Sequence, residues 1–213
     1  MDGDHMPMFP LGTVLFPGQL LPLHVFEPQY VQMLDHCLST DREFGVVLIE
    51  RGRELGGGDV RAPVGTVARI VDAAEAGPGR WAVLSVGTRR IRVRRWHPNC
   101  PWPNAEVEDL PDESSVDNTP IAQLWTDVQE DFRRIRGLAV RIAGSQATAA
   151  ESDDDPATGC FHLAALSPLG PFDRQRVLAA VGVEHRLRLL GQVFGEVEET
   201  LLATLAFGGE FDL

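Results

Sequence analysis

The chain has 213 residues, a formal net charge of −12 and no lysine, so all 19 basic side chains are arginines. The absence of lysine excludes a phosphate-binding loop of the G-K-[ST] type, a Ser-Lys dyad and a Schiff-base lysine. Because phosphates are neutralised by basic side chains, the acidic balance disfavours nucleic acid as a partner. With 44% hydrophobic residues, the chain can bury the core of one large domain or two small ones.

The first half of the chain alternates short apolar runs with turn residues, which is typical of an antiparallel barrel or sandwich. One helix is expected to interrupt the strands. Pro28 suits a first helical position, and Tyr30, Leu34 and Cys37 share one helical face. The expected strands cover residues 8–11, 19–25, 44–49, 64–71, 81–86, 88–96 and 105–110.

The periodicity changes after residues 111–119, a polar stretch that we interpret as a linker. Apolar residues then recur at steps of three and four, behind the capping pair Thr119-Pro120. We therefore expect two domains, residues 1–112 and 113–213, of which the second is an α-helical bundle. Its expected helices cover residues 120–142, 161–166, 173–181 and 187–205, with a loop at 144–158.

Each cysteine lies within three positions of a histidine. Such pairs are candidate zinc ligands, because thiolate and imidazole are the ligands that zinc prefers. The sequence contains no C-x2-C pair, however. One cysteine also lies on the apolar face of its helix, where cysteine behaves as a small hydrophobic residue. We therefore expect neither a metal nor a cofactor. The pairs are His36-Cys37, His97 with Cys100, and Cys160 with His162.

The three cysteines are odd in number and widely spaced, which indicates free thiols in a reducing compartment rather than a disulfide framework. The N-terminus lacks a basic region, and prolines and glycines interrupt its apolar stretch. No signal peptide or membrane span is therefore expected, and we interpret the protein as cytoplasmic.

Arginines alternate along the expected strand 88–96, so that Arg90, Arg92 and Arg94 share one face. A positive stripe in an acidic protein can bind a phosphate backbone or an acidic peptide. The alternative is that these arginines pair with nearby carboxylates such as Glu106 and Glu108. We favour the pairing, because nucleic-acid platforms use several stacking aromatic residues and few lie nearby.

Large apolar residues between prolines characterise the N-terminal segment from Phe9 to Phe26. In a strand, alternation buries about half of such residues in the core. The other half is available as an exposed apolar groove for extended peptides. Burial in the core is nevertheless the default for any single one of them.

An ordered series of short motifs runs through residues 7–110: Met8-Phe9-Pro10-Leu11, Leu15-Phe16-Pro17-Gly18, Leu21-Pro22-Leu23, Phe26-Glu27 with Tyr30, Gly65 to Ile70, Gly79-Arg80 and Gly87 to Arg90. This series resembles the N-terminal substrate-binding domain of the Lon protease family. Gln29 stands in place of the usual arginine, Ile91 falls near the usual phenylalanine, and Trp102 stands in place of the usual tyrosine. The stretch FHLAALSPLGPFDRQRVLAA is similar to the segment after the domain in standalone bacterial members.

The resemblance implies an α+β fold: a PUA-like antiparallel β-barrel with a packed helix, followed by an α-helical bundle. It also implies a non-catalytic module that binds unfolded or extended polypeptide, as an adaptor with a protease or a chaperone as partner. Lon proteases add a nucleotide-driven motor and a Ser-Lys protease, and this chain has no lysine for either. The residues expected to line or support the binding site are Phe16, Leu21, Phe26, Glu27, Tyr30 and Trp102.

Two other functions remain open at this point. PUA-like barrels bind RNA in other families, and the arginines at 90, 92 and 94 are the candidate contacts for RNA or a nucleotide. A small-ligand sensor with a pocket in the barrel is the third possibility, although no catalytic constellation in the sequence supports it.

Overall fold

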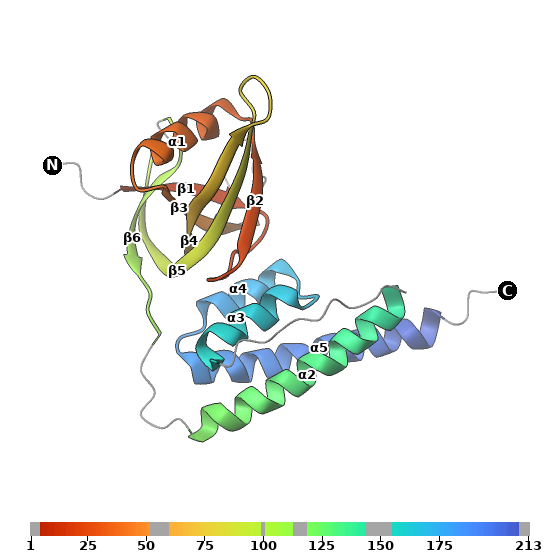
Figure 1. Ribbon diagram of the computed structural model, residues 1–213. Coiled ribbons are helices and arrows are strands. Elements are labelled where there is room, and N and C mark those ends of the chain that lie inside the picture. Colours follow the sequence, from red (N-terminus) through yellow and green to blue (C-terminus); the bar gives the residue numbers. More distant parts are fainter. Residues whose placement is uncertain (1–4, 52–59, 99–100, 113–118, 144–154, 209–213) are drawn as a thin grey trace. The chain divides into compact units, whose positions relative to one another are not determined.

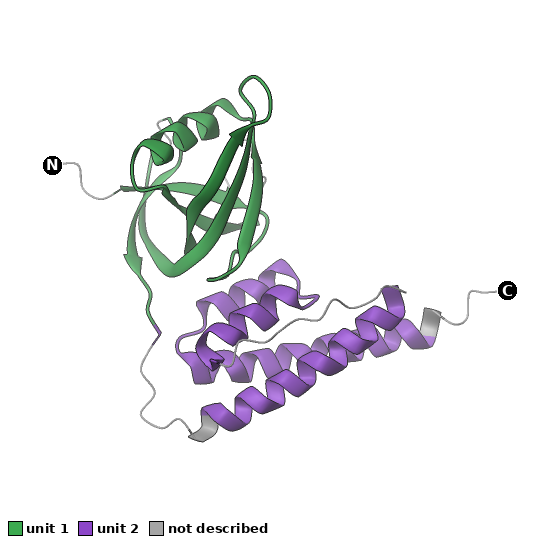
Figure 2. Cartoon of the chain, in the orientation of Figure 1, with its two compact units in different colours: residues 1–111 green, residues 112–213 purple. Residues whose placement is uncertain are grey.

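The computed structural model describes residues 5–51, 60–98, 101–112, 119–143 and 155–208. The chain divides into two compact units, Met1–Pro111 and Asp112–Leu213, which Figure 2 distinguishes by colour. Unit 1 contains the described strands and one helix, and unit 2 contains four helices (Figure 1). Cys100 and most of the expected loop at 144–158 lie outside the described residues. None of the described helices is both long enough and apolar enough to span a membrane.

Unit 1 is built on one six-stranded sheet in the order β2-β5-β4-β3-β1-β6. Strand β5 also pairs with β6. The strands β5, β4, β3, β1 and β6 are therefore linked in a closed ring of pairings. Strand β2 pairs only with β5 within the described part of the chain. The strands are β1 (His5–Leu11), β2 (Leu20–Val25), β3 (Glu43–Arg51), β4 (Val60–Glu75), β5 (Trp81–His97) and β6 (Asn104–Asp109).

Strands β1 and β3 run parallel, with Met8 opposite Gly45 and Leu11 opposite Leu48. The other described pairs are antiparallel. The prediction of a purely antiparallel arrangement is therefore wrong at this pair. Between β1 and β3 the chain forms β2 and the helix α1 (Pro28–Ser39), and such a long crossover allows a strand to return in the same direction.

The expected strands 81–86 and 88–96 form one continuous strand, β5, because Gly87 does not interrupt it. The turn before β2 approaches the backbone at this glycine, and the Gly18 N–H donates to the Gly87 carbonyl at 2.8 Å. A Cβ atom at position 87 would lie 2.2 Å from the carbonyl oxygen of Phe16. Glycine is therefore required here by the close approach of two backbones.

Helix α1 packs on the core of unit 1, and the helix expected from the sequence is confirmed. Pro28 occupies the first turn, where its missing N–H has no intrahelical partner to lose. The four buried positions of the helix follow the predicted spacing of three and four residues, and they join a core cluster with strand residues such as Phe44. These helical positions are Tyr30, Met33, Leu34 and Cys37.

Unit 2 consists of α2 (Thr119–Ala143), α3 (Pro156–Leu166), α4 (Pro171–Ala179) and α5 (Val183–Gly208). The two long helices, α2 and α5, lie side by side (Figure 1). Their contact includes the rings of Phe132 and Phe194, 6.3 Å apart. Helix α3 begins where the carboxylate of Asp155 accepts the N–H groups of Ala157 and Thr158, which satisfies two of the free donors at a helix start.

A buried ion pair joins the start of unit 2 to its helices. Arg186 on α5 has no exposed side-chain surface, and its guanidinium donates to both carboxylate oxygens of Asp112. The same guanidinium lies 4.0 Å from the ring centre of Phe161 and 3.4 Å from Sγ of Cys160, both on α3. Arg186 therefore links Asp112, α3 and α5 through polar and cation–π contacts.

Candidate functional site

Three of the six expected site residues, Phe16, Leu21 and Tyr30, belong to the core of unit 1. Phe16 has no exposed surface, and Leu21 on β2 is 9% exposed. The N–H of Phe16 donates to Oε1 of Gln19 at 3.1 Å, which fixes the turn before β2. Phe16 and Leu21 can support a surface from below, but a bound polypeptide cannot reach them.

Tyr30 lines a small apolar hollow between α1 and the sheet, with a cavity volume of about 10 Å³. Its ring stacks on Phe9 at 4.1 Å between centroids, with the ring planes 9° apart. Burial raises the pKa of the Cys37 thiol in the same hollow to about 12, so this thiol is neutral at ordinary pH. The hollow is lined by Phe9, Leu23, Val25, Tyr30, Met33, Leu34, Cys37, Phe44 and Val83.

Phe26 and Glu27 precede the first turn of α1 and differ in what they contact. Phe26 is 62% exposed, one of the most exposed large apolar side chains described. The carbonyl of Glu27 accepts the N–H groups of Tyr30 and Val31 at 2.9 Å, and its carboxylate accepts from Nε2 of Gln29 at 3.3 Å. Glu27 therefore braces the start of the helix, while Phe26 is available for contact.

Trp102 packs against the core of unit 1 near the other end of α1. Its ring lies 5.3 Å from the ring of His36, in the last turn of the helix. The indole N–H is buried and meets no acceptor among the described residues. Phe26 and His36 are ten positions apart, or about 15 Å along a helix, so Phe26 and Trp102 do not share one contact surface.

Exposed apolar residues, only partly expected from the sequence, lie on the outside of strands β2, β5 and β4, where the exposed Arg69 and Asp72 of β4 are opposite Val86 and Leu84. Leu20 on β2 is 59% exposed and Val71 on β4 is 56% exposed. The register places Leu20 opposite Val86 and Pro22 opposite Leu84, so each pair shares one face of the sheet. Five residues define what we call the outer apolar face: Leu20, Pro22, Val71, Leu84 and Val86.

The alternation in β2 contained a signal for this face, since Leu21 is buried while Leu20 and Pro22 are exposed. Val71 could not be found from the sequence, because it ends an apolar run in β4 that is typical of a buried strand. A register shift between Ile70 and Asp72 turns its side chain outward. Large apolar side chains gathered on one sheet face mark an interaction surface more often than scattered ones do.

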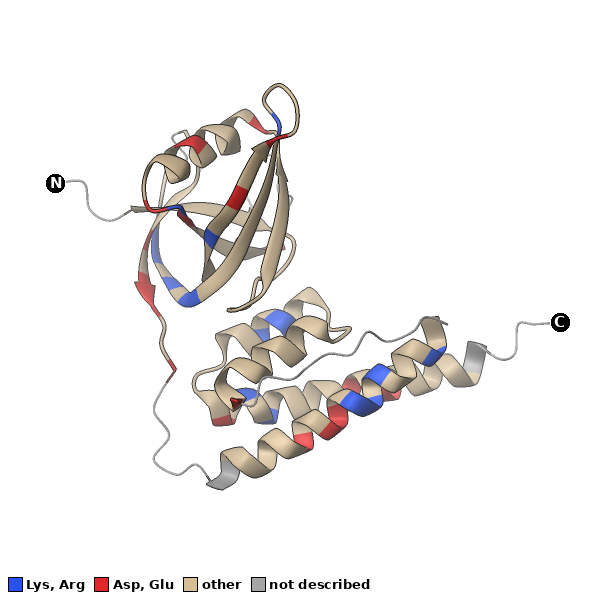
Figure 3. Cartoon of the chain, in the orientation of Figure 1, with Lys and Arg blue, Asp and Glu red and all other residues tan. Residues whose placement is uncertain are grey.

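The arginines of β5 do not form the exposed stripe that alternation predicted. Arg90 is only 5% exposed and so leaves the stripe. Arg94 pairs with Glu108 at 2.5 Å, and Arg95 lies 3.7 Å from Glu106. Figure 3 shows these acidic residues of β6 beside the basic residues of β5. Local carboxylates therefore pair with Arg94 and Arg95, as in the alternative that we favoured from the sequence, while Arg92 is half-buried.

The Cys–His pairs considered for zinc do not come together within the described chain. Cys37 is buried in unit 1 and Cys160 in unit 2, and both are free thiols. Burial raises the pKa of Cys160, although Arg186 opposes the shift. Neither thiol is placed or ionised as a zinc ligand needs to be.

Comparison with known proteins places this fold in a family. A model described as the ATP-dependent protease La (LON) substrate-binding domain matches residues 5–193, which extends over both units. A Lon protease 2 of Sorangium cellulosum is 28% identical over 94% of this chain and 26% of its own length. A Lon protease 2 of Myxococcus xanthus is 27% identical over 92% of this chain and 24% of its own. The chain thus spans about a quarter of these relatives.

Solved structures agree with the family model. A Lon N-terminal domain protein from Xanthomonas campestris is 30% identical, with a TM-score of 0.65 over 88% of this chain and 96% of its own. The N-terminal domain of a Mycobacterium avium complex Lon protease shares the fold at 18% identity, with a TM-score of 0.62 over 91% of this chain and 99% of its own. The chain belongs to the family of Lon substrate-binding domains.

Proposed function

We propose that this chain is a non-catalytic module that binds unfolded or extended polypeptide segments, and that the outer apolar face is the contact surface. The single observation that carries this proposal is the exposure of Leu20 and Val71, each more than half exposed, on the two strands that flank β5. Membership of a substrate-binding domain family supports the substrate class.

The shape of the outer apolar face suits an extended segment. Strand β2 has six residues, which is about 20 Å of extended chain, and its outward side chains recur every second residue. An extended polypeptide presents its own side chains with the same period. In the described chain β2 pairs only with β5, and Pro22 on β2 has no N–H group to donate to an added strand. The binding therefore depends on side-chain contact rather than on addition of a strand to the sheet.

The residues expected from the sequence take different parts in this proposal. Phe26, at the end of β2, extends the contact surface. Phe16 and Leu21 support β2 from the core side, and Tyr30 holds α1 against the sheet. Glu27 braces the first turn of α1, and Trp102 supports its last turn through the contact with His36.

The finer architecture and the cellular role are also part of the proposal. The closed ring of pairings supports a PUA-like barrel in residues 1–112, and the four packed helices support an α-helical bundle in residues 113–213. We further propose a cytoplasmic adaptor in protein quality control, with a protease or a chaperone as its partner. The free buried thiols support the reducing compartment.

A titration against a permanently unfolded, apolar polypeptide tests the binding. The variant Leu20→Thr/Val71→Thr keeps strand-forming side chains and removes apolar contact. It forfeits roughly 1.5 kcal/mol of burial, so its affinity should fall about tenfold. The matched control is Val60→Thr, since Val60 is 48% exposed on the same strand as Val71 but outside the outer apolar face. Equal binding by the double variant and the control would refute the surface, and no binding by the unchanged chain would refute the function.

The RNA alternative gains no support from the structure. Of the candidate arginines, Arg90 is buried and Arg94 pairs with Glu108, and breaking that pair would cost part of the binding energy. Phosphate binding would also weaken steeply with salt, whereas apolar polypeptide binding would not. Titrations against the polypeptide and against RNA, each repeated at higher salt, therefore separate the two functions.

A further inference from the structure

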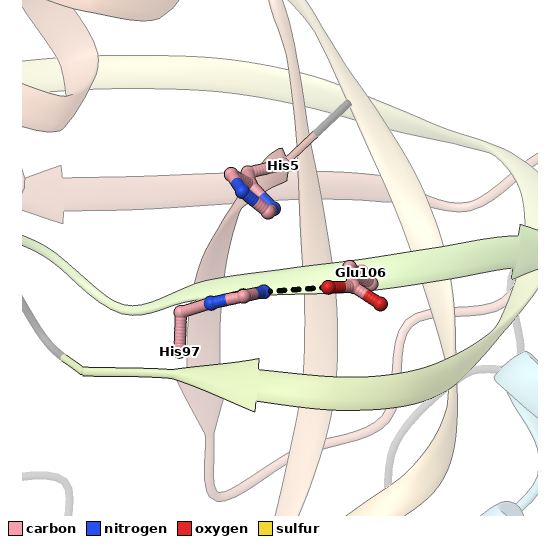
Figure 4. Close-up of side chains that lie close together, drawn as sticks. All are labelled: His5, His97 and Glu106. Carbon is pink, nitrogen blue, oxygen red and sulfur yellow. Dashed lines mark hydrogen bonds and ion pairs between the residues drawn. The ribbon is translucent and has the colours of Figure 1, made fainter. Parts of the chain in front are cut away.

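Three potential metal ligands meet on strands β1, β6 and β5: His5, Glu106 and His97. Their ligand atoms all lie within 4.8 Å of one another. Nε2 of His97 lies 3.0 Å from Oε1 of Glu106, and the two imidazole rings lie 4.1 Å apart. Figure 4 shows the three side chains close together, with the contact between His97 and Glu106 dashed.

The sheet register explains why these residues meet. His5 lies directly opposite Glu106 in the antiparallel pair of β1 and β6. His97 lies opposite Asn104 in the pair of β5 and β6, so Glu106 is its diagonal neighbour on the same face. Three strands thus hold the ligands, and each strand is fixed by backbone pairing rather than by a loop.

We propose that His5, His97 and Glu106 form a binding site for one Zn²⁺ ion, with the remaining coordination position taken by water. Two imidazoles and one carboxylate are a ligand set that zinc uses with an open fourth position. Zinc binds nitrogen and oxygen ligands at about 2.0–2.2 Å, which needs ligand atoms roughly 3.4 Å apart. The His97 and Glu106 atoms, now 3.0 Å apart, would open slightly to that spacing, and the exposed ring of His5 would approach them by a side-chain rotation.

Without zinc, Glu106 accepts from His97 and lies 3.7 Å from the guanidinium of Arg95. Both contacts are partly exposed, so they are weak competitors for the carboxylate. A zinc ion would replace two such weak contacts by coordination bonds. The bound ion would also link β1 to β5 and β6, at the place where β6 pairs with both of the other strands. This site shares no residue with the outer apolar face, and it departs from the expectation of no metal.

Isothermal titration of the full chain with ZnCl2 tests the site. The unchanged chain should bind one ion, and His97→Gln and Glu106→Gln should each weaken binding at least about tenfold. His24→Gln is the matched control, because His24 is another exposed histidine on a strand. Cys100→Ser serves as a second control, since this thiol follows His97 by three positions and should not be required.

A second readout guards against a variant that fails to fold. His5 is exposed at the start of β1, so His5→Gln should retain the fold and its circular dichroism while losing zinc affinity. Zinc should raise the midpoint of thermal unfolding in the unchanged chain but not in His5→Gln. Absence of one-to-one binding, equal affinity in His97→Gln, or loss of binding in Cys100→Ser would overturn the proposal.

Discussion

Removing either member of the buried pair between Asp112 and Arg186 should destabilise unit 2, but by different amounts. The side chain of Arg186 is 0% exposed, whereas that of Asp112 is 27% exposed. Burial lowers the pKa of Arg186, but its contacts with Cys160 and Asp112 outweigh this and hold the pKa above its ordinary value. The guanidinium therefore stays charged, and it cannot escape the loss of its partner by losing a proton.

The magnitudes depend on which charge is left behind. Asp112→Ala leaves a fully buried cation without its carboxylate, a loss that costs about 3–5 kcal/mol. Arg186→Met leaves a carboxylate that water already reaches, together with an apolar chain in place of the arginine stem, and should cost about 1–3 kcal/mol. Asp112→Ala/Arg186→Met leaves no buried charge and should be more stable than Asp112→Ala alone.

Urea unfolding followed by far-ultraviolet circular dichroism measures these differences, because the helical signal comes mostly from unit 2. Arg188→Met is the control, since Arg188 lies on the same helix with a side chain 61% exposed and pairs with Glu184 at 2.5 Å. An exposed pair of this kind is worth about 0.2–1 kcal/mol. If Arg186→Met were as destabilising as Asp112→Ala, or the double variant less stable than both, the explanation by buried charge would be refuted.

Two further predictions concern the glycine on β5 and the buried thiols. Gly87→Ala should destabilise unit 1 by about 2–4 kcal/mol, because its Cβ would meet a backbone oxygen. Gly137→Ala should instead stabilise α2 by about 0.5–1 kcal/mol, since nothing lies within 4 Å of a Cβ atom at this helical position. The midpoint of denaturant unfolding should therefore fall in the first variant and rise in the second. In a Cys100→Ser background, a thiol reagent should label Cys37 and Cys160 only after unfolding, and fast labelling of the native chain would contradict their burial. Burial raises the pKa of the Cys37 thiol from 9.0 to about 12. The contribution of this buried neutral thiol to stability is therefore complete below pH 9 and is lost as the pH rises through 12. In Cys37→Ala the free energy of unfolding should accordingly fall less steeply over this alkaline range.

The local elements of this fold could be predicted from the sequence because their signals are local. Pro28 and the apolar spacing after it predicted α1. The expected loop at 144–158 was wrong at its end, because α3 begins at Pro156, after the N-cap Asp155. Period-two alternation predicted that about half of the apolar residues of β2 are buried, but it did not indicate which half: Leu21, which was expected at the site, is buried, and Leu20 is exposed. The family resemblance added the order of these elements, and the match over residues 5–193 extends it into the helical unit.

Features that depend on partners distant in the chain could not be predicted in this way. The direction of β1 relative to β3 depends on the path of the crossover, which no local pattern records. The register shift that exposes Val71 is a property of two strands together. Arg186 looks like any helical arginine until Asp112, 74 positions away, is placed beside it.

The pairing of β1 with both β3 and β6 has a consequence for how the protein can be made. Glu106, the residue opposite His5, is synthesised about a hundred residues after it. During translation β1 therefore waits with one edge unpaired until β6 has emerged, and such long-range pairing is slow to form. Shortening the N-terminus through β1 would remove the strand that joins β3 to β6 and would open unit 1 in its middle.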